Sequence, residues 1–287
     1  MQWRLGSRTF DGEQTVVMAI VNRTPDSFYD AGATFTDGAA MAAVDRAVAD
    51  GAGIVDIGGV KAGPGDPVDA TEEIRRVVPF VEAVRKAHPS LVISVDTWRA
   101  EVARAVCDVG ADLLNDAWGG FDPALAGVAA RYGVGVVCTH TGGATPRTRP
   151  FRVTYADPTT EVATWMQREA RRCLDAGVRA DGLLVDPGHD FGKNTRHSLE
   201  ITRNLDRLAD LGWPLLVSLS NKDFVGETLD RPVDQRLSGT LAATAISAWL
   251  GACVFRAHDV RQTREVLDLV ASVQDRRPPA VARRGLA

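Results

Sequence analysis

Short apolar, β-branched segments alternate along this chain with longer segments of helical spacing, and this alternation most limits the folds it can adopt. Strands that alternate with helices form βαβ units, whose strands lie parallel in one sheet. Eight such units in 287 residues predict one closed (β/α)8 TIM barrel rather than an open, doubly wound sheet. The expected strands are 16–21, 53–57, 91–95, 112–114, 133–138, 182–185, 214–219 and 252–256.

The segments between these strands, and the two ends of the chain, complete the expected organisation. Helical spacing is found in 38–50, 70–87, 100–109, 158–176 and 233–250. At the start, Asp11–Gly12 predicts the turn of a short N-terminal hairpin that closes the bottom of the barrel. We therefore expect a single domain over residues 1–275, followed by a flexible C-terminal tail, 276–287, with paired arginines and prolines.

Composition excludes several classes of protein. Hydrophobic residues make up 45% of the chain, and the net charge of −4 argues against nucleic-acid binding. The four cysteines are far apart, which argues against a zinc ribbon or a disulfide framework. The chain has neither the apolar core of a secretory signal nor an apolar run long enough to span a bilayer, so we expect no membrane association and a cytoplasmic protein.

Polar residues recur where the predicted strands end. In a parallel barrel the active site lies at the carboxyl ends of the strands. Each of these residues alone has a structural explanation, such as a helix N-cap or a buried histidine, but a packed core would have to pair all of them at one end. The set is Asn22, Asp96, Asn115, Asp116, His140, Asp186, Lys222, Arg256 and His258.

The rare lysines support the same location. Arginine supplies 29 of the 33 basic residues, and three of the four lysines, Lys61, Lys193 and Lys222, follow predicted strands. Only Lys86 lies on a predicted helix with a solvated face. A compact ammonium at the mouth of a barrel suits a diphosphate oxygen or a ring carbonyl.

Several short motifs occur in a fixed order over residues 16–260. They are 18–28, Asp56-Ile-Gly-Gly59, Ser94-Val-Asp96-Thr97, Asn115-Asp116, Asp186-Pro-Gly188, Phe191-Gly-Lys193, Lys222-Asp-Phe224-Val-Gly226 and Arg256-Ala-His258-Asp259-Val260. Together they resemble the signatures of the dihydropteroate synthase family. That family joins 6-hydroxymethyl-dihydropterin diphosphate to p-aminobenzoate and releases diphosphate.

The resemblance implies a role for each matching position. Residues expected to bind the pterin ring are Asp96, Asn115, Asp186, Phe191 and Lys222. Residues expected to hold the diphosphate are Asn22, Arg256 and His258, with Asn22 also near a Mg²⁺ ion if the protein is active. The family reaction needs little acid–base work, because neutralising the leaving group is the main contribution, so no catalytic residue is assigned.

The second loop departs from the family pattern. The family has Gly-Gly-Glu-Ser-Thr-Arg-Pro-Gly, and this chain has glycines and a proline around Val60, Lys61, Ala62 and Gly63. An arginine of the seventh loop is replaced as well, by Asn221. Each lost charge-assisted hydrogen bond is worth about 1.5–3 kcal/mol. The expected result is a pterin pocket that is kept beside a second-substrate loop that is damaged.

Further departures add charge near the mouth. Arg23 replaces a small apolar residue of the family pattern, and Asp190 replaces a small residue after the sixth strand. Compensation for the lost arginine by Lys61 or Arg23 is one way in which activity could survive.

These departures lead to four functional hypotheses. The first is a dihydropteroate-synthase-like paralogue of folate biosynthesis with weak or no synthase activity. The others are a competent synthase that uses compensating cations such as Lys61, a non-catalytic binding or regulatory protein, and a pterin-binding methyltransferase. The resemblance also implies a second ligand, p-aminobenzoate or a sulfonamide-like molecule, and a homodimer, for which the small-residue run 241–250 would allow close helix packing.

Overall fold

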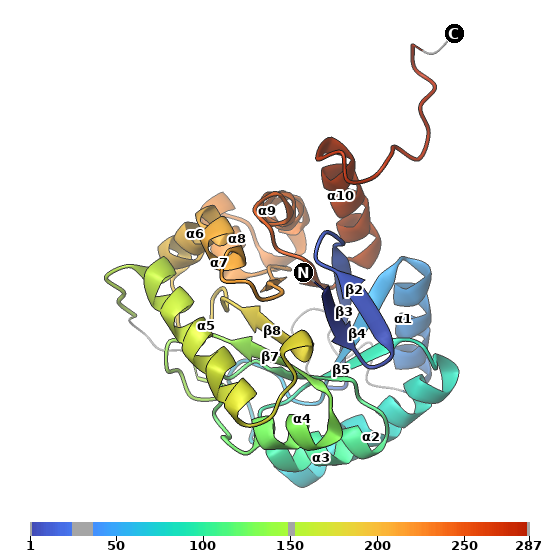
Figure 1. Ribbon diagram of the computed structural model, residues 1–287, viewed down its shortest axis with the longest axis vertical. Helices are drawn as coiled ribbons and strands as arrows, with labels where there is room; N and C mark the ends of the chain where they lie inside the picture. Colours follow the sequence, from blue (N-terminus) through green and yellow to red (C-terminus); the bar gives the residue numbers. More distant parts are fainter. Residues whose placement is uncertain (1, 25–36, 149–152, 286–287) are drawn as a thin grey trace.

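Parallel strands and surrounding helices form a barrel in the computed structural model, which describes residues 2–24, 37–148 and 153–285 (Figure 1). The eight-stranded sheet has the order β8-β7-β6-β5-β4-β3-β10-β9. Its two edges meet where the Val185 amide donates to the Pro214 carbonyl at 3.0 Å. The predicted TIM barrel is therefore confirmed. Its strands are β3 (Val16–Asn22), β4 (Ala52–Gly58), β5 (Val92–Asp96), β6 (Leu113–Asp116), β7 (Gly135–Thr139), β8 (Leu183–Asp186), β9 (Leu216–Ser218) and β10 (Val254–Ala257).

Helices cover the outside of this sheet. Several begin at side-chain caps: Asp69 accepts from the Glu72 amide at 2.8 Å, and Asp157 accepts from the Thr160 amide at 2.9 Å. None of the helices in the described ranges is long and apolar enough to cross a membrane. The helices are α1 (Asp37–Ala49), α2 (Ala70–Ala87), α3 (Ala100–Asp108), α4 (Leu125–Tyr132), α5 (Pro158–Asp175), α6 (Thr195–Arg203), α7 (Leu205–Ala209), α8 (Asp223–Leu229), α9 (Leu237–Trp249) and α10 (Val260–Val273), with 3-10 turns at Ala180–Gly182 and Val233–Gln235.

The strand ranges predicted from sequence lie within three residues of the observed ones. The largest differences are two residues, at β6, β7, β9 and β10; β7 begins at Gly135, and β9 has only three residues. The predicted helix 233–250 is divided, because a 3-10 turn precedes Arg236 and α9 starts after it. Residues 276–285 form no helix or strand and are exposed, and in Figure 1 this segment leads away from α10.

The period of two along each strand separates two apolar layers. Met18 and Ile54 point into the barrel and pack there, whereas Val17 and Val55 point outward against the helices. Both layers are buried, as expected for a parallel sheet covered by helices. The packed interior leaves the carboxyl ends of the strands as the place where polar side chains can meet.

The N-terminal hairpin closes the other end of the barrel. It consists of β1 (Gln2–Leu5) and β2 (Arg8–Asp11), which pair antiparallel. The predicted hairpin is confirmed, but its predicted turn at Asp11–Gly12 is wrong, because the strands are joined at Gly6–Ser7, where Gly6 has φ +53°. The Asp11 carboxylate instead accepts from the Glu13 amide at 3.1 Å, in a second turn that leads to β3.

The hairpin contributes to stability through Trp3, which is 1% exposed and stacks on Phe10 with ring centroids 4.1 Å apart. We expect Trp3→Ala to lower the free energy of unfolding by about 3–5 kcal/mol, because it leaves a cavity under the barrel. Urea denaturation measures this. The matched control is Phe121→Ala, at an aromatic residue that is 55% exposed, and its effect should stay below about 0.5 kcal/mol. Equal losses in the two variants would show that the hairpin does not stabilise the barrel.

Candidate functional site

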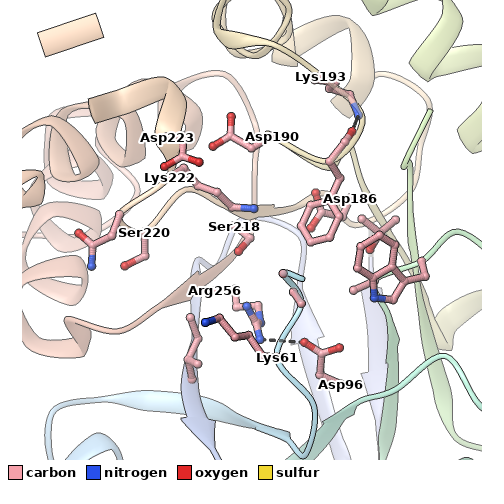
Figure 2. A pocket seen from close by; sticks show the side chains of 18 of the residues that line it. Lys61, Asp96, Asp186, Asp190, Lys193, Ser218, Ser220, Lys222, Asp223 and Arg256 are labelled. Carbon is pink, nitrogen blue, oxygen red and sulfur yellow. Dashed lines mark hydrogen bonds and ion pairs between the residues drawn. The ribbon is translucent and has the colours of Figure 1, made fainter. Parts of the chain in front are cut away.

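A cavity of about 420 Å³ opens at the carboxyl ends of the strands. Seven of the nine side chains predicted from the strand ends line it, as the labelled residues of Figure 2 illustrate, whereas Asp116 and His140 are buried and do not line it. The predicted convergence is thus confirmed for these seven residues, and their roles in binding stay predictions. The predicted ligand-binding residues that line the cavity are Asn22, Asp96, Asn115, Asp186, Phe191, Lys222, Arg256 and His258. The substituted residues that line it are Val60, Lys61, Ala62, Gly63 and Asn221.

Asp56 organises the floor of the cavity. It is fully buried, and its carboxylate accepts hydrogen bonds from the Ser94 hydroxyl at 2.6 Å, the Asn115 amide nitrogen at 3.1 Å and Arg256 Nε at 2.6 Å. Sequence reasoning assigned Asp56 no role, because it precedes the end of its strand. The alternation of side chains along the strand could have predicted its place, because Asp56 lies two residues after the inward-facing Ile54 and so points into the barrel as well.

Arg256 joins this floor to Asp96. Its Nη2 donates to Asp96 Oδ2 at 3.0 Å, the contact drawn as a dashed line in Figure 2. Burial raises the pKa of Asp96 to about 7, although the nearby Arg256 cation opposes that shift. A carboxyl group with a pKa near neutrality can accept a hydrogen bond or donate one, which suits recognition of a ring with amide and amidine edges.

Lys222 lies on the other side of the cavity. Its Nζ donates to the His189 carbonyl at 2.9 Å and stands 4.4 Å from the centre of the Phe191 ring. Burial lowers the pKa of Lys222, and the carboxylates of Asp190 and Asp186 oppose this. The ammonium is therefore held between an aromatic face and two acidic side chains.

Asp190 also connects the loops that carry these groups. Its backbone has φ +65°, a conformation that aspartate tolerates better than most residues. The carboxylate accepts from the Ser198 hydroxyl at 3.1 Å and from the Phe224 amide at 3.2 Å, in the first turn of α8. The charge that the sequence comparison placed at the mouth therefore caps a helix and faces Lys222.

Lys193 has a different role from the one its position suggested. Its Nζ is within hydrogen-bond distance of His140 Nδ1 at 2.8 Å and of the carbonyl oxygens of His140, Gly188 and Phe191 at 2.9–3.0 Å. Burial lowers the pKa of Lys193 to about 7, and that of His140 to about 2, so the histidine is neutral and accepts. His140 is buried in the wall and does not line the cavity. Lys193 thus fastens the loops after β7 and β8 to each other.

The substituted second loop is held in place by apolar packing and by hydrogen bonds to its backbone. Val60 is buried in an apolar cluster with Trp98, Ala117 and Trp118. Two arginines hold the loop by its backbone: Arg76 Nη1 donates to the Gly59 carbonyl at 3.0 Å, and Arg147 Nη1 donates to the Asp66 carbonyl at 2.6 Å. The substituted loop is therefore held by apolar packing and by hydrogen bonds to its backbone.

Asn221 replaces the family arginine of the seventh loop, and asparagine suits the backbone conformation at this position. It has φ +58°, where asparagine is favoured, and its backbone N–H donates to the Thr240 hydroxyl at 3.2 Å. The side chain is buried, and because a carboxamide is uncharged, Asn221 brings no positive charge to the cavity as an arginine would.

The described residues contain no group of three or more His, Cys, Asp or Glu side chains placed to hold a metal ion. The amide oxygen of Asn22, which lies at the cavity, is a ligand type that Mg²⁺ accepts. Magnesium is commonly bound by one or two protein oxygens together with substrate phosphates. A Mg²⁺ ion here would depend on a phosphorylated ligand for most of its coordination.

Comparisons with known proteins agree with this geometry. Residues 18–258 match the family model described as pterin binding enzyme. A relative from Mycobacterium leprae, named inactive dihydropteroate synthase 2, is 58% identical, and the match covers 100% of both chains. The dihydropteroate synthase of Haemophilus influenzae is 38% identical, with 88% of this chain and 91% of that protein covered. The crystal structure of Yersinia pestis dihydropteroate synthase with a sulfonamide drug has a TM-score of 0.91 at 35% identity, covering 96% and 100% of the two chains.

The contacts of Lys193 predict a large effect from one substitution. Lys193→Met should destabilise the protein by several kcal/mol, because buried carbonyl groups lose their donor at about 1–3 kcal/mol each. The unfolding midpoint measures the loss, and hydrogen exchange should accelerate in residues 188–193. Lys86→Met, on the exposed face of α2, is the control. A Lys193 variant as stable as the Lys86 variant would show that the ammonium does not fasten the two loops.

Proposed function

Because this chain belongs to the family of pterin-binding enzymes, as a dihydropteroate-synthase-like protein, we propose that it binds a pterin in the barrel mouth and has weak or no synthase activity. The observation that supports binding is the convergence of Asp96, Asn115, Asp186 and Lys222 on one cavity. These are the positions that the sequence assigned to the ring.

The proposed roles follow from the chemistry of a pterin. Its amide and amidine edges offer N–H donors, which the carboxylates of Asp96 and Asp186 accept, and a carbonyl, to which Lys222 Nζ donates. Phe191 offers its ring as a packing surface. Asn115 is oriented by its bond to Asp56, so its amide oxygen is presented at a fixed place.

The groups at Asn22, Arg256 and His258 would face the substituent on the pterin methylene. If that substituent is a diphosphate, Mg²⁺ would neutralise its oxygens, with Asn22 as the ligand from the protein. The His258 ring is oriented by the Ser220 hydroxyl, 3.0 Å from its Nδ1. These residues would bind and orient a leaving group without any acid–base step.

The proposal of low synthase activity rests on the substituted second loop of the cavity. Val60 is committed to the apolar cluster, and Ala62 and Gly63 carry neither the hydroxyl nor the guanidinium of the family loop. Loss of two arginines and a threonine hydroxyl removes several kcal/mol of stabilisation, at about 1.4 kcal/mol per tenfold in rate. The second ligand, p-aminobenzoate or a sulfonamide-like molecule, would then bind weakly if at all.

Two measurements test this function. Calorimetric titration with 6-hydroxymethyl-dihydropterin and its diphosphate should detect binding, and Lys222→Met should weaken it at least about tenfold, whereas Lys86→Met should not. A steady-state assay with the diphosphate and p-aminobenzoate should give no product above background. Absence of binding by either pterin would contradict the proposal, and turnover typical of a synthase would contradict the loss of activity.

One observation favours a second candidate, a competent synthase: Lys61 lines the cavity and brings a cation to the substituted loop. If turnover is found, Lys61→Ala should abolish it. Turnover that survives this substitution would show that Lys61 does not replace the family arginine.

We also propose that the protein forms a homodimer in the cytoplasm through α9 and α10, which pack side by side (Figure 1). Large apolar side chains are exposed on both helices: Ile246 and Trp249 on α9, and Leu269 and Val273 on α10. Such a shared apolar face is typical of an interface between copies. Light scattering should give twice the chain mass, and Trp249→Asp should give the mass of a monomer. A monomeric parent chain would contradict this interface.

A further inference from the structure

Three of the four cations that line the cavity, Arg256, Lys193 and Lys222, are already engaged by acceptors of the protein. Arg256 uses Nε and Nη2 for the carboxylates of Asp56 and Asp96. A guanidinium that bridges two carboxylates, one buried and one partly exposed, brings little net positive charge to a ligand, because the opposite fields largely cancel at short range. The charge of Arg256 is therefore used mainly in ion pairs within the floor of the cavity, and little of it is left to attract an anionic ligand.

The two buried lysines are used in a similar way. Lys193 is surrounded by His140 Nδ1 and three carbonyl oxygens, which occupy all the donors of an ammonium. Lys222 donates to the His189 carbonyl and is held near Asp190 and Asp186. Burial lowers the pKa of both lysines, that of Lys193 to about 7, so Lys193 carries less charge near neutral pH than an exposed lysine.

The lining of the cavity has no excess of positive charge within the described part of the chain. Asp223 is compensated from outside by Arg236, 2.9 Å away, and Asp56 adds a negative charge behind the lining. The lining carboxylates are Asp96, Asp186, Asp190, Asp223 and Glu227, against the cations Lys61, Lys193, Lys222 and Arg256. Burial raises the pKa of Asp96 to about 7 and also raises that of Asp186, so the charge of the lining is close to balanced.

This balance favours one class of ligand over another. A diphosphate ester carries several negative charges and binds best where uncompensated cations and helix N-termini face it. The ring of a pterin is uncharged near neutral pH and needs paired acceptors, a donor and an apolar face, all of which line this cavity. The free energy of binding should therefore come from the ring.

We propose that this cavity selects an uncharged pterin, such as a 6-hydroxymethyl-dihydropterin without phosphate, and gains little from a diphosphate. The inference rests on the proposed pterin binding and specifies its ligand. A ligand without a diphosphate has no leaving group of the family reaction, which accounts for a kept ring site beside a substituted loop. Mg²⁺ would then have little to bind and little effect on affinity.

Titration of the full chain with both pterins, with and without Mg²⁺, tests the inference. The dissociation constants for the diphosphate and for the free hydroxymethyl compound should lie within about tenfold of each other, and Mg²⁺ should not widen the difference. A diphosphate bound more than tenfold tighter overturns the inference while leaving pterin binding intact. Failure of both ligands to bind overturns the proposed function itself.

Two variants test the cause. Asp190→Gly removes a carboxylate beside Lys222 at a backbone with φ +65°, which glycine adopts without strain. Asp56→Asn removes one of the two carboxylates that compensate Arg256. At least one variant should shift the ratio of the two dissociation constants about tenfold toward the diphosphate, whereas Asp210→Asn, at an exposed position, should not. An unchanged ratio in both folded variants would show that the carboxylates do not set this preference.

Discussion

The buried pairing of Asp56 with Arg256 is the interaction on which the rest of the site depends. It joins β4 to β10, the two neighbours of β3 in the sheet, and through Ser94 and Asn115 it also reaches β5 and β6. A buried charge is tolerated only when it is paired and hydrogen-bonded, so the positions of these side chains are mutually dependent. The floor of the cavity is one network, and the ring-binding groups above it take their orientation from that network.

The fold and the location of the site could be predicted because they follow from local patterns. Strand periodicity and the rule that parallel strands end at one face placed Asn22, Asp96 and Arg256 together correctly. The sequence predicted the N-terminal hairpin correctly but placed its turn at the wrong residues. Asp11–Gly12 has favourable turn chemistry, yet the pairing of Leu5 with Arg8 fixes the connection at Gly6–Ser7. Register depends on which side chains are buried, and Trp3 and Phe10 determine it here.

What could not be predicted depends on contacts between residues distant in sequence. Lys193 can donate to the carbonyl oxygens of His140 and Gly188 only because the fold brings the loops after β7 and β8 together, and the sequence does not show this contact. The second loop presents the same problem. Its sequence shows which side chains were lost, but the burial of Val60 and the bond from Arg147 to Asp66 require the folded chain. The substitutions predicted a damaged loop, whereas the folded chain holds this loop by packing and by backbone hydrogen bonds.

The closure of the barrel bears on how the cavity can adapt. Between β8 and β9 the described chain forms one isolated bridge, at Val185 and Leu215, whereas neighbouring strands elsewhere pair over at least three residues. Asp186 lies at the end of β8 and Lys222 follows β9, on opposite sides of this seam. Widening the seam changes the span between an acceptor and a donor with few backbone bonds broken. The width of the ring site along that direction is therefore held mainly by side-chain contacts across the seam, from Lys222 to the His189 carbonyl and from the Phe224 amide to Asp190.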